Sequence, residues 1–239
     1  MTKTLIALLF LSTASVATVI STDAPSAGSA PAVPTPTPTP TPALAGGQGA
    51  ELNREAFTED KIAPMVKPAK YDLTIVEYTD YQCPFCKAAH PALQKLLASD
   101  KKIRLIYRDW PIFGAQSVTA ARVAIASKYQ GKHAQVHDAL MKAPRPPTDQ
   151  SIRAAVTKAG ANWTRLQADI KENAAEIDAL LERNNEQAES LGLQGTPAFI
   201  VGTYLSEGGM DYASLKHAVH EARTKPAPPL KPAPQPEGI

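Results

Sequence analysis

The stretch that decides the fold runs from residue 74 to residue 87 and reads Thr-Ile-Val-Glu-Tyr-Thr-Asp-Tyr-Gln-Cys-Pro-Phe-Cys-Lys. Together with Leu73, its first half is rich in β-branched and aromatic residues, which favours a strand. Its second half opens a helix, because Pro84 suits the first helical position, where its missing N–H has no partner to lose. A strand therefore leads into a helix, and Cys83 and Cys86 lie at the junction.

The residues that follow continue the helix and lead to a second strand. One helical face carries apolar residues at spacings of one, three and four, namely Phe85, Ala89, Leu93, Leu96 and Leu97. Residues 103–108, Ile-Arg-Leu-Ile-Tyr-Arg, form a second β-favouring run. Strand, helix and strand in this order are the opening of a βαβ unit.

A long helical block comes next and precedes two more strands. Apolar residues at spacings of three and four predict several helices between about residues 111 and 191. After Gly195 the pattern changes, and we expect short strands at 198–201 and 204–205 and a last helix around 212–219. The predicted fold class is α/β, with a helical insertion.

The chain begins like an exported protein. Lys3 precedes an apolar run from Leu5 to Leu11, and small residues with a cleavage site after Ala17 follow. We therefore expect a signal peptide that is removed, and a periplasmic or other extracytoplasmic location. An uncleaved N-terminal membrane anchor is the alternative, although the apolar stretch is short for a span.

Proline marks the limits of the globular part. Seven prolines fall between Pro25 and Pro42 and six between Pro226 and Pro236. Such segments bury too little apolar surface to offset the entropy of ordering. The predicted organisation is a signal peptide, a disordered Pro/Thr/Ala-rich linker, an N-terminal extension, one domain and a disordered tail, at residues 1–17, 18–50, 51–70, 71–223 and 224–239 respectively.

The charge pattern argues against one class of partner. The chain has 25 basic and 23 acidic residues, a formal charge of +2, and no basic run interleaved with aromatic residues. We therefore expect no nucleic-acid partner.

The two cysteines of the chain, Cys83 and Cys86, allow three interpretations. A structural disulfide closing so small a loop would contribute little stability. A metal site would need two further ligands, from a helical pair such as His133 and His137, which lie far along the chain and are better explained by half-buried packing. We expect no metal and no cofactor.

The third interpretation is a redox pair. Unpaired backbone N–H groups and the helix dipole at a helix N-terminus stabilise an anion. A thiolate at Cys83, the predicted N-cap, would be both a ready nucleophile and a good leaving group. Cys86, one turn further in, is expected to be the more buried, resolving thiol.

Two more ionisable residues lie near this pair in sequence. Glu77 stands six residues before Cys83, among apolar strand residues. A buried carboxyl there would have a raised pKa and could exchange a proton with Cys86, whereas a solvent-facing strand position is the alternative. His90, one turn beyond Cys86, either tunes that thiol or makes a polar contact without function.

Two segments resemble the signatures of the bacterial DsbA-like family of thioredoxin-fold proteins. They are residues 74–87, quoted above, and residues 195–202, Gly-Thr-Pro-Ala-Phe-Ile-Val-Gly. Residues 110–114, Trp-Pro-Ile-Phe-Gly, and the helices after them resemble the family's inserted helical domain. The resemblance covers about residues 71–223. It implies a thioredoxin fold with a central mixed β-sheet and the activity of a protein thiol:disulfide oxidoreductase.

The resemblance also implies roles for single residues. Pro197 matches a proline that is cis and lies against the redox pair, and Thr196 before it is expected to bind an extended substrate. Glu77 matches the family's buried acidic residue. The active-site dipeptide is Pro84-Phe85, whereas the most oxidising members carry a histidine in place of Phe85, so we expect a reduction potential below about −120 mV.

The function expected is the introduction of disulfides into exported proteins that carry cysteine thiols, with a membrane redox partner recycling the dithiol. An isomerase or reductase kept reduced would use the same residues with the opposite poise. A dithiol metal-binding module is the third hypothesis, without support from any Met-rich or further Cys/His segment. With no heptad run before Tyr71, we expect a monomer.

Overall fold

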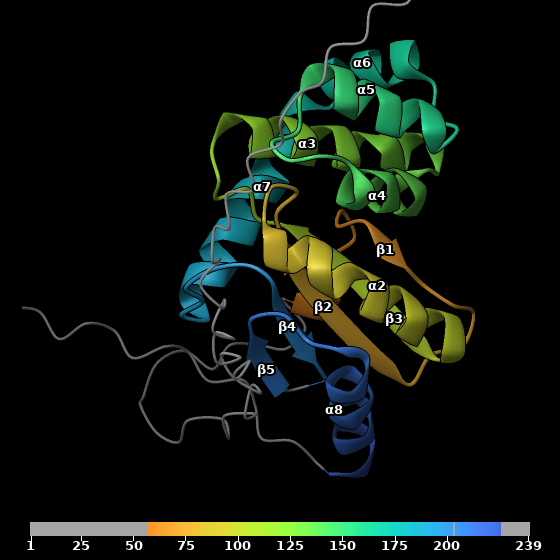
Figure 1. The fold of residues 1–239 in the computed structure, drawn as a ribbon, viewed down its shortest axis with the longest axis vertical. Coiled ribbons are helices and arrows are strands. Elements are labelled where there is room, and N and C mark those ends of the chain that lie inside the picture. Colours follow the sequence, from red (N-terminus) through yellow and green to blue (C-terminus); the bar gives the residue numbers. More distant parts are fainter. Residues whose placement is uncertain (1–56, 203, 226–239) are drawn as a thin grey trace, which may run out of the picture. The chain divides into compact units, whose positions relative to one another are not determined.

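The computed structural model describes residues 57–202 and 204–225 (Figure 1). The predicted signal peptide, the linker at 18–50 and the tail from residue 226 lie outside the described residues. Among those described, no helix has the length and apolar character needed to cross a membrane.

A five-stranded mixed sheet has the strand order β1-β3-β2-β4-β5. The strands are β1 (Met65–Val66), β2 (Leu73–Thr79), β3 (Ile103–Asp109), β4 (Ala198–Val201) and β5 (Tyr204–Glu207). Strands β2 and β3 are parallel, as the βαβ pattern predicts, and the other three neighbouring pairs are antiparallel. The α/β thioredoxin-fold class expected from the sequence is confirmed.

The register of β2 against β3 decides what faces the site. Glu77 pairs with Tyr107, and Thr79 pairs with Asp109. Because side chains alternate along a strand, these four residues share one face of the sheet. Further along the same strands, that face is apolar and packs against helices α2 (Pro84–Ser99) and α8 (Tyr212–Thr224).

The opposite face is covered by part of the helical insertion. Its apolar residues, including Val76, Tyr78 and Ile106, belong to a second core cluster with helices of the insertion. The insertion lies between β3 and β4 and consists of α3 (Ala115–Ala126), η1 (Ser127–Gln130), α4 (His133–Lys142), α5 (Asp149–Lys158), α6 (Trp163–Glu172) and α7 (Ala174–Ser190). Helices α3 to α6 gather beyond the end of the sheet where α2 begins (Figure 1).

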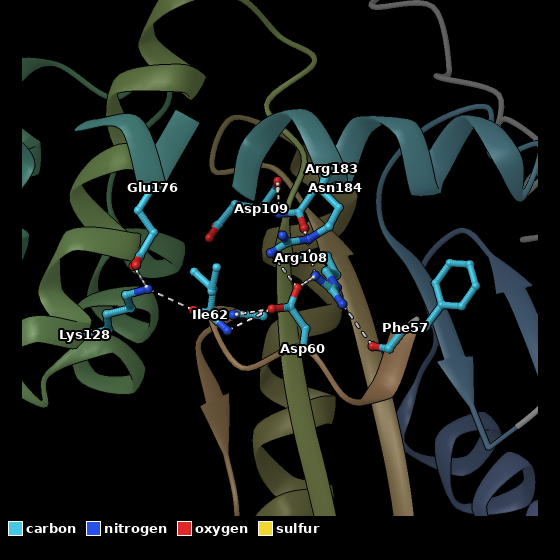
Figure 2. Close-up of polar contacts among 10 residues, drawn as sticks. Phe57, Asp60, Ile62, Arg108, Asp109, Lys128, Glu176, Arg183 and Asn184 are labelled. Carbon is cyan, nitrogen blue, oxygen red and sulfur yellow. Dashed lines mark hydrogen bonds and ion pairs between the residues drawn. The ribbon is translucent and has the colours of Figure 1, made fainter. Parts of the chain in front are cut away.

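A buried charge network fixes the chain upstream of β1 to the sheet (Figure 2). The fully buried Arg108 of β3 donates to the Asp60 carboxylate at 2.6 Å and to the Phe57 carbonyl at 3.0 Å. Arg183 of α7 lies 2.8 Å from the same carboxylate. Burial alone would raise the pKa of Asp60, but its hydrogen bonds, above all that from Arg108, hold it below the ordinary value. The ordered fold therefore includes residues before Tyr71.

Candidate active site

Cys83 and Cys86 lie where β2 leads into α2. Cys83 is the N-cap of this helix and Pro84 is in its first turn, as the sequence predicts. The backbone N–H of Cys86 donates to the Cys83 sulfur at 3.3 Å. Both cysteines are free, and the exposed fraction of each is 0%. The exposed fraction therefore does not distinguish the two thiols, but Cys86 lies deeper among protein atoms than Cys83, as the sequence predicts.

The two thiols also differ in acidity. The hydrogen bond from the Cys86 side chain, helped by Thr196 and by backbone N–H groups and opposed by burial, lowers the pKa of Cys83 from 9.0 to about 6. Burial, with the hydrogen bond to Cys83, raises the pKa of Cys86 far above its ordinary value. Near neutral pH the reduced pair thus holds a thiolate at Cys83 and a thiol at Cys86.

The loop before β4 lies against the dithiol. The Cys83 thiol and the Thr196 carbonyl oxygen are 3.1 Å apart. The Thr196 side chain lowers the pKa of both thiols, and the Thr196–Pro197 peptide bond is cis, as the resemblance implies. Residues 195–202, the second signature segment, therefore lie against residues 74–87, the first.

Glu77 lies deep beneath the helix start. Its exposed fraction is 0%, and neither carboxylate oxygen has a hydrogen-bond partner within the described part of the chain. It is one strand repeat, about 7 Å, from Thr79, whose side chain lowers the pKa of Cys86. Burial, with the nearby Asp109, raises the pKa of Glu77 to about 8. The solvent-facing alternative for Glu77 is wrong.

Asp109 is a second buried acid, which the sequence reasoning missed. It is 1% exposed and pairs with Thr79 across β2 and β3. Burial raises the pKa of Asp109 to about 7, although the Tyr81 hydroxyl beside it opposes the rise. A signal was present, because the parallel strands of a βαβ unit end at the same edge of the sheet, which places the last residue of β3 near the start of α2.

The turn before Cys83 is held rigidly by Asp80. Its carboxylate accepts hydrogen bonds from the Gln82 N–H at 2.7 Å, the Ser117 hydroxyl at 2.6 Å and the Phe113 N–H at 3.1 Å. The Gln82 amide donates in turn to the Phe113 carbonyl at 2.9 Å. The dithiol turn is thus fastened to the start of the helical insertion.

Large apolar side chains are exposed around this turn. Phe85, between the cysteines, is 67% exposed, and Ile112 and Phe113 are 41% and 50% exposed. Exposed apolar groups of this size are typical of interaction sites.

The histidines expected to be half-buried are in fact buried. His133 is 7% exposed and His137 is 0% exposed. His137 Nδ1 shares a hydrogen bond of 2.9 Å with the Tyr81 hydroxyl, and His90 Nε2 is 2.9 Å from Asp138 Oδ1. Within residues 57–202 and 204–225, no cluster of three or more His, Cys, Asp or Glu side chains could hold a metal ion.

A thiolate-stabilising dithiol at a helix N-terminus, facing a cis-proline loop beside a mixed sheet, defines a thioredoxin-fold oxidoreductase. The family model DSBA-like thioredoxin domain matches residues 74–220. The chain belongs to this family and is a thiol–disulfide oxidoreductase.

Solved structures of similar proteins agree with this family assignment. A thioredoxin-like oxidoreductase from Silicibacter pomeroyi DSS-3 has 35% identity and a TM-score of 0.69, covering 73% of this chain and 99% of that one. A periplasmic thioredoxin-like protein from Salmonella enterica serovar Typhimurium has 31% identity and a TM-score of 0.66, with coverages of 75% and 100%. The thiol-disulfide exchange protein alpha-DsbA2 from Wolbachia pipientis has 29% identity and a TM-score of 0.66, with coverages of 70% and 90%.

The curated relatives are much longer. The Na(+)/H(+) antiporter NhaA 1 of Salinispora arenicola is 25% identical over 157 residues, which cover 65% of this chain. The match spans 24% of the antiporter's length.

Proposed function

We propose that the protein is a dithiol oxidase that introduces disulfides into exported proteins. The observation that carries the proposal is the position of the Cys83 sulfur at the N-cap of α2, where it accepts a hydrogen bond from the Cys86 N–H at 3.3 Å and its pKa is lowered to about 6. A stabilised thiolate favours the reduced form of the pair, so the disulfide is readily reduced and oxidises its substrate. Phe85, which stands between the cysteines in place of a histidine, keeps the expected potential below about −120 mV.

The reaction has two exchange steps. A substrate thiolate attacks the Cys83 sulfur, a mixed disulfide forms, and the Cys83–Cys86 bond breaks with the electron pair leaving on Cys86. A second substrate thiolate then attacks the substrate sulfur of the mixed disulfide, and Cys83 leaves as a thiolate. The substrate has lost two electrons to the protein, and a membrane oxidase removes them when it restores the Cys83–Cys86 bridge.

The leaving Cys86 needs a proton, since its pKa is far above neutral. Glu77, with a pKa of about 8, carries one at neutral pH and lies on the same face of β2 as Thr79, whose side chain acts on Cys86. We assign Glu77 as the donor in this step and as the acceptor when the bridge is restored.

The substrate is an incompletely folded polypeptide. Such a chain offers the apolar side chains that the exposed Phe85, Ile112 and Phe113 would contact. Thr196 and Pro197 would hold its backbone beside Cys83. The N-terminal export pattern and the periplasmic neighbour from Salmonella support an extracytoplasmic location, and the absence of a heptad run before Tyr71 supports a monomer.

The direction of transfer is tested with two forms of one substrate. In the first experiment the oxidised protein is mixed with reduced, unfolded ribonuclease, and no other oxidant is added. In the second, the reduced protein is mixed with ribonuclease whose disulfides are scrambled. We expect oxidation of the first, no refolding of the second, and a monomer mass by light scattering. A multimer that refolds the scrambled substrate and leaves the reduced one unoxidised would make the protein an isomerase.

The metal-binding alternative is tested on the same sample. Zinc(II) is titrated into the reduced protein while free thiols are counted. We expect micromolar zinc to leave both thiols reactive. Tight, stoichiometric binding that blocks both thiols, in a protein that does not oxidise ribonuclease, would overturn the oxidase proposal.

A further inference from the structure

The two buried acids of the site have no direct exit for a proton. Glu77 and Asp109 have exposed fractions of 0% and 1%. Each cycle of the proposed function nevertheless moves a proton to Cys86 when the bridge opens and away from it when the bridge closes. A buried site that exchanges protons once per turnover needs a chain of donors and acceptors reaching the solvent.

The inner end of such a chain is Tyr81. Its hydroxyl lies near Asp109, whose carboxylate oxygens are buried without a hydrogen-bond partner in the described part of the chain, and the charges of Glu77 and Asp109 both act on it. The same hydroxyl shares a hydrogen bond of 2.9 Å with His137 Nδ1 of α4, which is 56 residues away in sequence. Tyr81 thus connects the acids at the end of the sheet with the helical insertion.

The outer end is His90 of α2. Its Nε2 lies 2.9 Å from the Asp138 carboxylate, and the Asp138 side chain is 35% exposed. His90 itself is 1% exposed, so Asp138 is its contact with the surface.

The two histidines meet between these ends. The His90 and His137 ring centroids are 5.3 Å apart. Each ring uses one nitrogen in the contacts above, and the other, His90 Nδ1 or His137 Nε2, is buried without a hydrogen-bond partner among the described residues. Because these two nitrogens are not hydrogen-bonded to each other, a bridging water between the rings is needed to connect them.

We propose that Tyr81, His137 and His90 form a proton relay that connects the buried acids with Asp138 at the surface. The proposal rests on the function proposed above and extends its proton step. As Cys86 leaves, Glu77 gives it a proton and takes one from Asp109; Tyr81 then protonates Asp109 while taking a proton from His137. His90 replaces the proton of His137 and takes one from solvent through Asp138. One proton moves inward, and the direction reverses when the bridge is restored.

The surroundings keep the relay groups neutral, as such a relay requires. Burial lowers the pKa of both histidines and raises that of Tyr81. Lys87 and Lys142 also lower the pKa of His90, whereas Asp138 raises it. Lys87 lowers the pKa of His137, and His133, whose own pKa burial lowers to about 3, is uncharged from pH 5 to 9. A neutral imidazole has one donor and one acceptor nitrogen, so it passes a proton on without first becoming charged.

The test compares Tyr81→Phe and His90→Gln with a matched control, His133→Phe. His133 stacks on His137 with ring centroids 5.9 Å apart, but it makes no hydrogen bond along the route. Reduction of the full-chain protein's disulfide by dithiothreitol is followed by stopped flow from pH 5 to 9, in H₂O and D₂O. The equilibrium potential against glutathione is measured for each variant.

We expect Tyr81→Phe and His90→Gln each to slow the reaction at least tenfold near neutral pH, since a positioned general acid contributes ~10²–10⁴-fold. The solvent isotope effect should change with the rate, while the equilibrium potential stays at the wild-type value. His133→Phe should match the wild type in rate, pH profile and isotope effect.

Wild-type rates and isotope effects in both relay variants would overturn the relay while leaving disulfide transfer intact. Equal slowing by His133→Phe would also overturn it, because packing would then explain the effect. If Tyr81→Phe does not fold cooperatively, His90→Gln alone decides by the same criteria. A wild-type protein that exchanges with dithiothreitol but oxidises no ribonuclease would refute the proposed function instead.

Discussion

The Thr196 carbonyl oxygen lies 3.1 Å from the Cys83 sulfur, although the two residues are 113 positions apart in the chain. This contact joins the start of α2 to the loop before β4. It places the Thr196 side chain near both thiols, whose pKa values it lowers, in addition to the larger effect of Cys86 on Cys83.

Replacing Thr196 by Val should raise the pKa of Cys83 from its value of about 6, because the Thr196 side chain helps to lower it. We expect a rise of less than about 1 unit, because a full hydrogen bond is worth ~1 kcal/mol and the Thr196 hydroxyl makes none of good geometry within the described residues. The pH dependence of thiolate absorbance or of alkylation measures it. Thr196→Ser keeps the hydroxyl and is the control. Identical midpoints for the Val and Ser variants would contradict the assignment.

The two cysteines should behave differently when replaced singly. Cys83→Ser removes the attacked sulfur and should abolish disulfide exchange. Cys86→Ser leaves the acidic thiol of Cys83 without its resolving partner and should accumulate mixed disulfides with substrates. Non-reducing electrophoresis after alkylation measures both effects. If both variants trap equally little partner while the wild type is active, the assigned roles are reversed or wrong.

Replacing Glu77 by Gln should change both rate and stability. The isosteric amide cannot exchange a proton with Cys86, so turnover should slow, and unchanged rates across pH would leave Glu77 a structural residue.

In the folded state the pKa of Glu77 is about 8, against 4.5 for the free side chain. The unfolded chain thus loses its proton first, and wild-type stability falls as the pH rises from 4.5 to 8.

The stability of Glu77→Gln relative to the wild type should therefore increase across that window, by up to about 1.4 kcal/mol per pH unit. Denaturant unfolding of both proteins at pH 4, 6 and 8 measures the difference. A difference that does not change with pH would mean that Glu77 is ionised in the folded protein.

The buried charge network around Arg108 (Figure 2) should contribute strongly to the stability of the fold. Asp60→Asn would leave the fully buried Arg108 without a charged partner, and removing one member of a buried ion pair costs about 3–5 kcal/mol. Asp178→Asn, which breaks the exposed ion pair with Arg122, is the matched control and should cost less than about 1 kcal/mol. Equal losses in the free energy of unfolding would show that Arg108 finds other compensation.

Local signals in the sequence predicted the elements that carry the dithiol. The β-branched run ending at Thr79, and Pro84 after Cys83, fix a strand and a helix start from neighbouring residues alone. The edge strand β1 was not predicted, because two residues give no period and its pairing with β3 is a tertiary contact.

The inner part of the site could not be predicted in the same way. Asp109, Tyr81 and His137 come together through strand register and through packing of α4 against α2, neither of which leaves a pattern in a single segment. Periodicity predicted a helix around His137 but assigned its ring to half-buried packing. Only the folded chain places the ring against Tyr81.

The helices from α3 to α7 separate the dithiol from Thr196 along the chain, which matters because a protein is synthesised from its N-terminus. Cys83 and Cys86 emerge long before residue 196 does. Until β4 is added to the sheet, Cys83 lacks the contribution of Thr196 to its lowered pKa, although the contribution of Cys86 is local to the turn. The contact between Cys83 and the Thr196 carbonyl therefore forms only after synthesis has passed residue 196.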